Sequence, residues 1–152
     1  MSTDVLPEAT IKRTFNAPRA KVFKAWVDSK QMAQWFGPKS FDNPVCELDA
    51  RPGGKLKIHM RGPDGTVYPC HGTFHEIVEP ERLVFTSQAI DQAGNVLIEA
   101  LNTVTFTEQG DKTALTLHVR VVKVVGIGAQ YIKGMEQGWS QSFEKLKSLV
   151  RG

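Results

Sequence analysis

The side chains of this sequence that could bind a metal ion or transfer protons near neutral pH are four histidines and two cysteines: His59, His71, His75, His118, Cys46 and Cys70. A zinc site needs about four such ligands around one ion. His71 and His75 share one face of a predicted strand, but the rise of a strand separates their Cα atoms by about 13 Å. Because Cys70 points away from His71, a site would need ligands from several strands. We assign no metal and no cofactor.

Acid–base catalysis requires a titratable side chain inside an apolar site. The candidates by strand alternation are Glu47, His59, Glu76 and His118. Charged positions of this kind usually lie on the solvated face of a sheet. The sequence has no Gly-x-Ser-x-Gly nucleophile motif, and Cys46, next to Leu48, fits a small core residue. We assign no catalytic residue, and the sequence favours a protein that is not an enzyme.

Two glycine-rich segments have the composition of phosphate-binding loops. Arg51-Pro-Gly-Gly54 is not followed by a helix that could supply amide donors, so we interpret it as a turn. Gly126-Ile-Gly128 begins like a dinucleotide-binding motif, but Tyr131 occupies the position of the third glycine. The surrounding sequence also lacks a parallel βαβ unit, so nucleotide binding is excluded.

Composition and charge exclude further classes of function. Hydrophobic residues make up 41% of the sequence and charged residues 23%, as in ordinary globular proteins. The net charge of +3 comes from interspersed charges without a basic block, so we expect no nucleic-acid partner. No apolar run approaches the ~20 residues of a membrane span. The N-terminus lacks the features of a signal peptide, and two cysteines without an export signal predict a cytoplasmic protein.

The elements that must position these residues begin with a strand at 10–15. Asn16 is a good helix N-cap and Pro18 fits the first turn, so a helix should follow. Asp28, with Gln31 three residues later, predicts a second short helix that ends at Trp35 before Gly37-Pro38.

A meander of short antiparallel strands follows, with turns at 62–65 and 91–95. The predicted strands are 45–50, 55–61, 67–78, 83–88, 96–107 and 113–122. Apolar residues at a period of 3.6 then predict one long helix at 127–150. We expect an α+β helix-grip fold, in which a curved antiparallel sheet of about six to seven strands wraps the C-terminal helix.

A strongly curved sheet around one helix encloses more volume than one layer of side chains fills, so we expect a cavity. Phe143, Leu146 and Leu149 should close its narrow end. The N-terminal half of the last helix carries four glycines: Gly126, Gly128, Gly134 and Gly138. Each costs about 1 kcal/mol relative to alanine inside a helix. They would allow either close approach of the helix to the sheet or a mobile gate to the cavity.

A set of short motifs follows one order along residues 9–150. The motifs are Ile11-Lys-Arg-Thr-Phe15, Asn16-Ala-Pro-Arg19, Val22-Phe23-x-x-Trp26, Trp35-Phe36-Gly37-Pro38, Asp49-x-Arg51-Pro-Gly-Gly54, Pro63-Asp-Gly65, Glu79-Pro-Glu-Arg-Leu83 and Gly138-Trp139. Together they resemble the single-domain family named for similarity to the activator of the heat shock protein 90 ATPase. This family belongs to the START-like (SRPBCC) superfamily, which shares the birch-pollen-allergen fold. Phe36 stands where the family often has a second tryptophan. The resemblance implies a helix-grip fold with a hydrophobic ligand cavity.

We therefore expect one START-like domain over 1–152, with 1–8 as a loose N-terminal tail. The leading hypothesis is binding of a hydrophobic or amphipathic small molecule, such as a lipid, polyketide or aromatic metabolite. The candidate cavity-lining residues are Trp35, Phe36, Phe41, Phe74, Met135 and Trp139. The Trp35-Phe36 pair could instead anchor the short helix to the sheet. Alternative functions are a polyketide cyclase or aromatase and a protein-interaction module, either co-chaperone-like or a homodimer.

Overall fold

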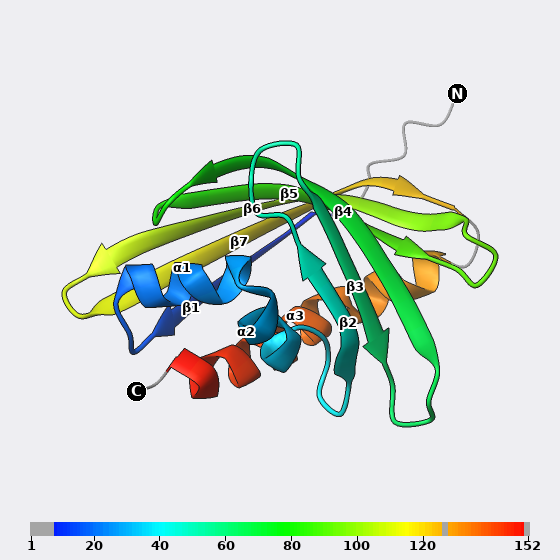
Figure 1. Ribbon diagram of the computed structural model, residues 1–152, viewed down its shortest axis with the longest axis horizontal. Coiled ribbons are helices and arrows are strands. Elements are labelled where there is room, and N and C mark those ends of the chain that lie inside the picture. The colour runs from blue at the N-terminus through cyan, green and yellow to red at the C-terminus, as the bar shows by residue number, and fades with distance from the viewer. Residues whose placement is uncertain (1–7, 126–127, 151–152) are drawn as a thin grey trace.

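The structure, a computed structural model, describes residues 8–125 and 128–150, and the side chains of all of these except 128–134. Its sheet has seven antiparallel strands in the order β1-β7-β6-β5-β4-β3-β2 (Figure 1). The strands are β1 (Glu8–Phe15), β2 (Asp42–Leu48), β3 (Lys55–Arg61), β4 (Val67–Val78), β5 (Arg82–Ile90), β6 (Val96–Gln109) and β7 (Lys112–Val124). The helices are α1 (Arg19–Val27), α2 (Ser29–Trp35) and α3 (Gly128–Val150).

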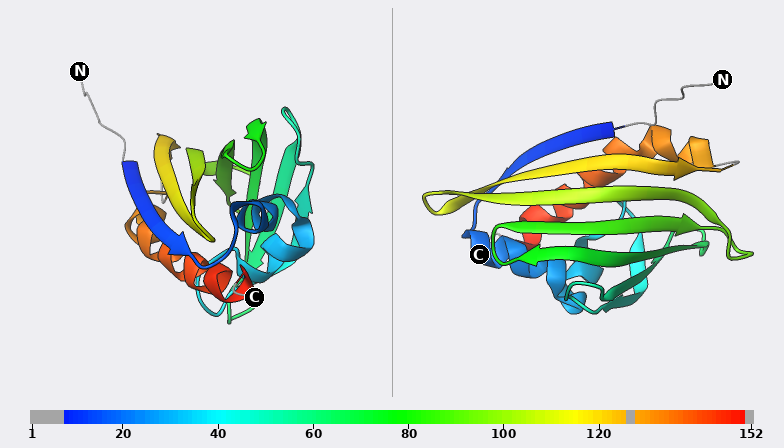
Figure 2. Two further views of the ribbon diagram at one scale, coloured as in Figure 1. Left: turned by 90° about the vertical axis from the view of Figure 1, so that its left-hand side faces the viewer. Right: turned by 90° about the horizontal axis from the view of Figure 1, so that it is seen from above.

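The arrangement of these elements confirms the predicted helix-grip fold. Strands β2 to β7 form a meander, and β1 pairs with β7 at the edge of the sheet. Figure 2 shows the sheet curling around α3, while α1 and α2 lie together beside α3 on the same side. The concave face of the sheet and the three helices therefore enclose the interior of the molecule.

Bulges and one close backbone approach accompany the curvature of the sheet. The register shifts between Phe74 and Glu76 in the pairing of β4 with β5, and again between Glu99 and Ala100 in the pairing of β6 with β7. Gly72 on β4 lies so close to the Thr86 carbonyl of β5 that a Cβ atom would overlap it. Glycine is therefore required at this position, as expected where two strands of a bent sheet approach closely.

Several element boundaries differ from the sequence predictions, and β1 begins at Glu8 rather than at residue 10, so Glu8 is not part of a loose tail. Two of the differences have causes in backbone chemistry. Asn16 is not the cap of α1: the helix begins at Arg19, and the Pro18 carbonyl accepts from the N–H of Val22 at 3.2 Å. Pro18 holds an extended conformation (φ −61°, ψ 150°) that starts the helix later. Strand β2 begins at Asp42 rather than Val45, because Pro44 is tolerated on an edge strand beside a register shift.

The second helix follows its prediction closely. The Asp28 carboxylate accepts hydrogen bonds from the backbone N–H of Lys30 at 2.9 Å and of Gln31 at 3.4 Å. These bonds satisfy amide groups that a helix start leaves without partners. The helix ends at Trp35, and Gly37 then takes a positive φ of 98°, which glycine adopts without strain.

The packed core fills one end of the interior with aromatic rings. Trp26 of α1 is fully buried, with its ring centroid 4.7 Å from that of Trp35 and 6.1 Å from that of Phe143. Phe106 of β6 lies edge-on to Trp26 at 6.2 Å. Phe143 and Leu146 are buried and Leu149 packs against the core, so the C-terminal half of α3 closes this end as expected.

Candidate functional site

A cavity of about 460 Å³ lies between the concave face of the sheet and α3. Its lining comes from five strands, from α3 and from the segment 36–41 that follows α2. The lining residues that the structure describes are Phe36, Gly37, Pro38, Phe41, Met60, Tyr68, Pro69, Cys70, Ser87, Ala89, Ile90, Leu97, Ile98, Ala100, Asn102, Val119, Met135, Gly138, Trp139 and Ser142. Within this set no side chain is charged, and most are apolar.

The segment 36–41, which we call the mouth loop, is bound to α3 by a row of hydrogen bonds. The Ser142 hydroxyl accepts from the Gly37 N–H at 3.0 Å, and its oxygen lies 2.9 Å from both the Gly37 and the Gly138 carbonyl oxygens. The Lys39 N–H donates to the Gln141 side-chain oxygen at 2.9 Å. These bonds fix one wall of the cavity against the helix.

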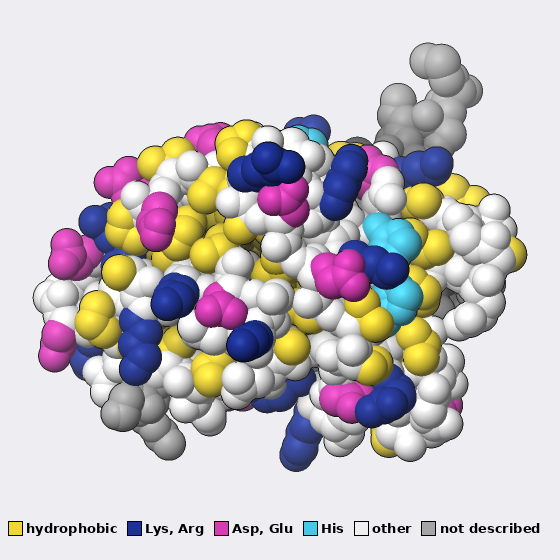
Figure 3. Space-filling model, in the orientation of Figure 1, with side chains coloured by type: hydrophobic (Ala, Val, Ile, Leu, Met, Phe, Trp, Pro, Cys, Tyr) yellow, Lys and Arg dark blue, Asp and Glu magenta, His cyan; other side chains and the backbone are white. Residues whose placement is uncertain are grey.

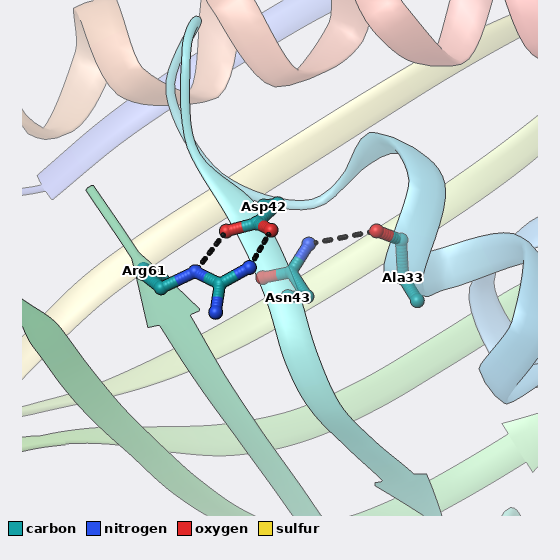
Figure 4. Close-up of polar contacts among 4 residues, drawn as sticks. All are labelled: Ala33, Asp42, Asn43 and Arg61. Carbon is teal, nitrogen blue, oxygen red and sulfur yellow. Dashed lines mark hydrogen bonds and ion pairs between the residues drawn. The ribbon is translucent and has the colours of Figure 1, made fainter. Parts of the chain in front are cut away.

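Polar contacts at the start of β2 hold the other end of the mouth loop (Figure 4). The Asn43 amide donates to the Ala33 carbonyl at 3.0 Å and to the Phe36 carbonyl at 2.8 Å, so it joins β2 to the end of α2. Arg61 of β3 makes a two-point contact with the Asp42 carboxylate, with Nε 3.1 Å from Oδ1. The guanidinium holds the pKa of Asp42 below its usual value. Phe41 directly precedes Asp42 and Asn43, so their side-chain contacts hold its end of the mouth loop in place.

The six residues proposed from the sequence fall into two groups. Phe36, Phe41, Met135 and Trp139 line the cavity. Trp35 and Phe74 lie outside the cavity wall and are buried in the packed core.

The positions of Trp35 and Phe74 have local causes. The Trp35 indole N–H donates to the Ala25 carbonyl of α1 at 2.9 Å, which turns its ring toward α1. Phe74 precedes the register shift in β4 and packs against Phe85 at 6.2 Å. Both interpretations of the Trp35-Phe36 pair therefore apply, one to each ring: Trp35 anchors α2, and Phe36 forms part of the wall.

The glycines at the start of the last helix were predicted to allow either close approach of the helix to the sheet or a mobile gate to the cavity. Gly126 lies outside the described residues, and the close surroundings of Gly128 and Gly134 are not described. At Gly138 a Cβ atom would find the Pro38 ring as its nearest neighbour, at an ordinary distance of 3.8 Å. Close packing therefore does not require glycine at Gly138.

The most buried polar side chain of the cavity wall is Asn102 of β6, which is 1% exposed. Its Nδ2 lies 2.9 Å from the Ser87 hydroxyl oxygen, 3.3 Å from the Phe85 carbonyl oxygen and 3.5 Å from the Ala100 carbonyl oxygen. Sequence reasoning missed this residue. The available signal was one asparagine among the inward positions of β6, where Ala100, Val104 and Phe106 are apolar.

The thiol of Cys70 also lines the cavity, and burial raises its pKa to about 12. It is therefore a neutral thiol at pH 7. Burial, with a smaller contribution from the charge of Glu47, raises the pKa of the Cys46 thiol to about 11. Neither cysteine has the lowered pKa of a reactive nucleophile.

The other chemically capable residues lie away from the cavity. The Glu76 carboxylate pairs with Arg82 at 3.0 Å, and the His118 ring lies 2.9 Å from the Glu8 carboxylate. His59 and His71 stack across β3 and β4 with ring centroids 5.8 Å apart, a contact that the sequence spacing did not suggest. Among the described residues, no three metal-binding side chains gather at one point.

The visible surface carries side chains of both charges, interspersed with hydrophobic ones (Figure 3). This distribution matches the mixed charge pattern of the sequence. In the described part of the chain, no helix combines the length and apolar composition that a membrane crossing requires.

The curved sheet, the gripping helix and the apolar cavity define a helix-grip protein of the START-like class. The sequence profile of the family described as "Activator of Hsp90 ATPase homolog 1-like protein" matches residues 16–151. The chain belongs to this family, as its motifs indicated, and the fold suggests a ligand-binding domain.

Solved structures of similar proteins come from several bacteria. A protein from Arthrobacter aurescens superposes with a TM-score of 0.85 at 25% identity, covering 94% of this chain and 85% of its own. A protein from Chromobacterium violaceum gives 0.83 at 24% identity and covers 95% and 97%, and one from Mycobacterium smegmatis gives 0.81 at 27% identity and covers 95% and 91%. No curated protein matches the sequence significantly.

Proposed function

We propose that the protein binds a hydrophobic or amphipathic small molecule in the cavity between the sheet and α3. The observation that carries this proposal is a space of about 460 Å³ with a predominantly apolar lining. Pockets for small molecules typically measure about 300–1,000 Å³ and carry a few polar groups among apolar ones. A lipid, polyketide or aromatic metabolite fits this description, and the whole chain would act as one binding domain.

Binding would derive mainly from the removal of apolar surface from water, at about 25 cal/mol per Å². The rings of Phe36, Phe41 and Trp139 offer large rigid contact areas, and Met135 offers a flexible one. The hydrogen bonds between α3 and the mouth loop support the proposal, because a preformed wall lowers the entropy cost of binding.

The geometry favours binding over catalysis of the cyclase or aromatase type. That chemistry needs a titratable group poised near the working pH inside the cavity. Cys70 is a neutral thiol with a pKa raised to about 12, and neither Asn102 nor Ser87 titrates. The candidate acids and bases from the sequence (Glu47, His59, Glu76 and His118) are absent from the lining residues described.

An interaction with a chaperone of the Hsp90 type, which the family description names, is a different class of function. A partner surface of this kind would present clustered apolar residues. The large hydrophobic side chains most exposed in the described part of the chain are Val78, Val122 and Val125. Val78 ends β4, whereas Val122 lies near the end of β7 and Val125 directly follows that strand, so the three do not form one patch.

The test compares binding to wild-type protein and to a variant with a filled cavity. Ala100 lines the cavity, and Ala100→Phe should fill part of it. We expect a panel of apolar and amphipathic molecules, titrated by calorimetry, to include binders with Kd below about 100 μM for the wild type, weakened at least tenfold in Ala100→Phe. Native mass spectrometry of freshly purified protein should reveal any molecule carried from the cell.

The matched control is Ala114→Phe, which adds the same ring on β7. Ala114 alternates with the buried Thr113 and Leu115, so it lies on the outer face of the sheet. Its affinity for the panel should equal that of the wild type. The proposal fails if no molecule of the panel binds, or if both variants bind as well as the wild type.

A further inference from the structure

Two polar groups in the cavity wall have hydrogen-bonding capacity left over. The backbone fixes the orientation of the Asn102 amide, because the carbonyl oxygens of Phe85 and Ala100 can only accept hydrogen bonds. The Nδ2 group must face them, at 3.3 and 3.5 Å. Among the described residues no group donates to Asn102 Oδ1. Asn102 therefore presents an acceptor to which no described residue donates, on a side chain that is almost completely buried.

The neighbouring Ser87 supplies the complementary donor. Its oxygen accepts from Asn102 Nδ2 at 2.9 Å, which leaves the hydroxyl hydrogen free to donate. Both residues line the cavity, on adjacent strands β5 and β6. One acceptor and one donor therefore stand side by side in a wall that is otherwise mostly apolar.

Ser142 shows the difference between a structural and an available polar group. Its hydroxyl accepts from the Gly37 N–H and lies within 2.9 Å of two carbonyl oxygens, so its hydrogen is engaged within the protein. Asn102 and Ser87 have no such complete set of partners in the described residues. A ligand that displaces water from these groups must supply the missing partners, because a polar group that is buried without a partner is destabilising.

We propose that Asn102 and Ser87 form a polar anchor that selects a ligand with an uncharged hydroxyl group on an apolar body. A hydroxyl can donate to Asn102 Oδ1 and accept from the Ser87 O–H at the same time. A ketone or ether can only accept, so it leaves Asn102 unpaired. A carboxylate also cannot donate, and it would bring a charge that no described lining residue balances. This inference rests on the proposed binding function and adds the chemical class of the ligand.

The test uses two probes of nearly equal shape, 2-naphthol and 2-methylnaphthalene, which differ by a hydroxyl in place of a methyl group. The quantity measured is the ratio of their dissociation constants, determined by calorimetry at pH 7. We expect Asn102→Leu to shift this ratio about tenfold against 2-naphthol, because it removes the acceptor and keeps an apolar side chain of similar size. Ser87→Ala should shift it in the same direction.

Ile98→Val is the control, since Ile98 lines the same cavity without a polar group. It should change both dissociation constants alike and leave the ratio at its wild-type value. Ser87→Ala keeps the test decisive if Asn102→Leu does not fold. A ratio unchanged in every folded variant overturns the polar anchor and leaves the binding function intact. Failure of both probes to bind a wild-type protein that binds other molecules of the panel overturns the anchor alone. Failure of the probes and of the whole panel overturns the anchor together with the binding function.

Discussion

The two ends of the space between sheet and helix are built from similar residues but filled differently. At the packed end, Trp26, Trp35 and Phe143 contact one another at ring distances of 4.7–6.4 Å and leave no exposed surface of note. At the open end, the aromatic residues of the mouth loop face a cavity of about 460 Å³. Aromatic composition therefore does not distinguish a core from a binding site in this fold.

Trp139 lies on the boundary between the two ends. Its ring stacks on Trp26 at 5.8 Å with an interplanar angle of 20°, and it also lines the cavity. The packed end therefore supports one wall of the open end. Helices α1 and α2 fill the space beside Trp26, whereas the mouth loop and the long strands β4 to β6 border the space beyond Trp139.

The largest expected effect is on the packed end. Trp26→Ala should lower the free energy of unfolding by about 3–5 kcal/mol, because it removes a fully buried ring with five aromatic neighbours. Trp139→Ala, at a partly exposed position, should cost about 1–3 kcal/mol and weaken ligand binding about tenfold. Chemical denaturation and calorimetry measure the two quantities.

The comparison between the two ends requires that Trp26→Ala has the larger effect on stability, while Trp139→Ala weakens ligand binding. If Trp139→Ala destabilises the protein as much as Trp26→Ala and leaves ligand affinity unchanged, Trp139 belongs to the core alone. The conservative Trp139→Phe serves as the control, because it keeps an aromatic ring next to Trp26. It should retain most of the stability and part of the affinity.

The packed end was more predictable from the sequence than the open end. The 3.6-residue period of α3, the Asp28 cap and the alternation of Leu56 and Ile58 each reflect a local rule, and each holds in the structure. The Asn16 cap failed because Pro18 imposes its own backbone conformation at the same site. Local rules therefore placed the elements to within a few residues.

The cavity wall was less predictable from the sequence, because it depends on where strands that are distant in sequence meet. Phe74 has the alternation of an inward residue, but the bulge after it and the contact with Phe85 place it in the core. The pairing of Ser87 with Asn102 requires the register of β5 on β6, which the sequence does not state. The predicted lining residues were chosen mainly because they are aromatic, whereas the polar residue of the cavity wall that the prediction missed is a single asparagine, Asn102.

A smaller effect is expected for the hydrogen bonds that join the mouth loop to α3. Ser142→Ala should lower the free energy of unfolding by about 1–3 kcal/mol, because it leaves the buried Gly37 N–H without a partner. Ligand binding should weaken as the mouth loop loosens, and hydrogen exchange of the loop amides should accelerate. Ser148→Ala, on the exposed side of α3, is the control and should change neither. Unchanged hydrogen exchange of the loop amides would show that these hydrogen bonds do not order the open end.

The smallest effect concerns the outer face of the sheet behind the cavity. Burial, followed by the nearby His59 and the charge of Lys57, lowers the pKa of His71 below its usual value of 6.5. The unfolded chain therefore binds a proton more readily than the folded protein, so stability falls as the pH drops from 6.5 toward the lowered pKa. The neighbour on β5, Gln88, is uncharged and bonds to Glu99 at 2.6 Å.

Because His71 is only partly buried, solvent reduces this effect, and it should appear as a modest drop in melting temperature between pH 7 and pH 5. His71→Gln should show a smaller drop, while the difference between the two proteins at pH 8 gives the effect of the substitution itself. Cys70, the neighbour of His71 in β4, lines the cavity on the opposite face of the sheet. The strand that carries His71 is therefore also part of the cavity wall. Acidification should therefore accelerate hydrogen exchange in β3 and β4 more than in α1. Equal acceleration in both would mean that the two ends unfold as one unit, and that their difference is confined to packing.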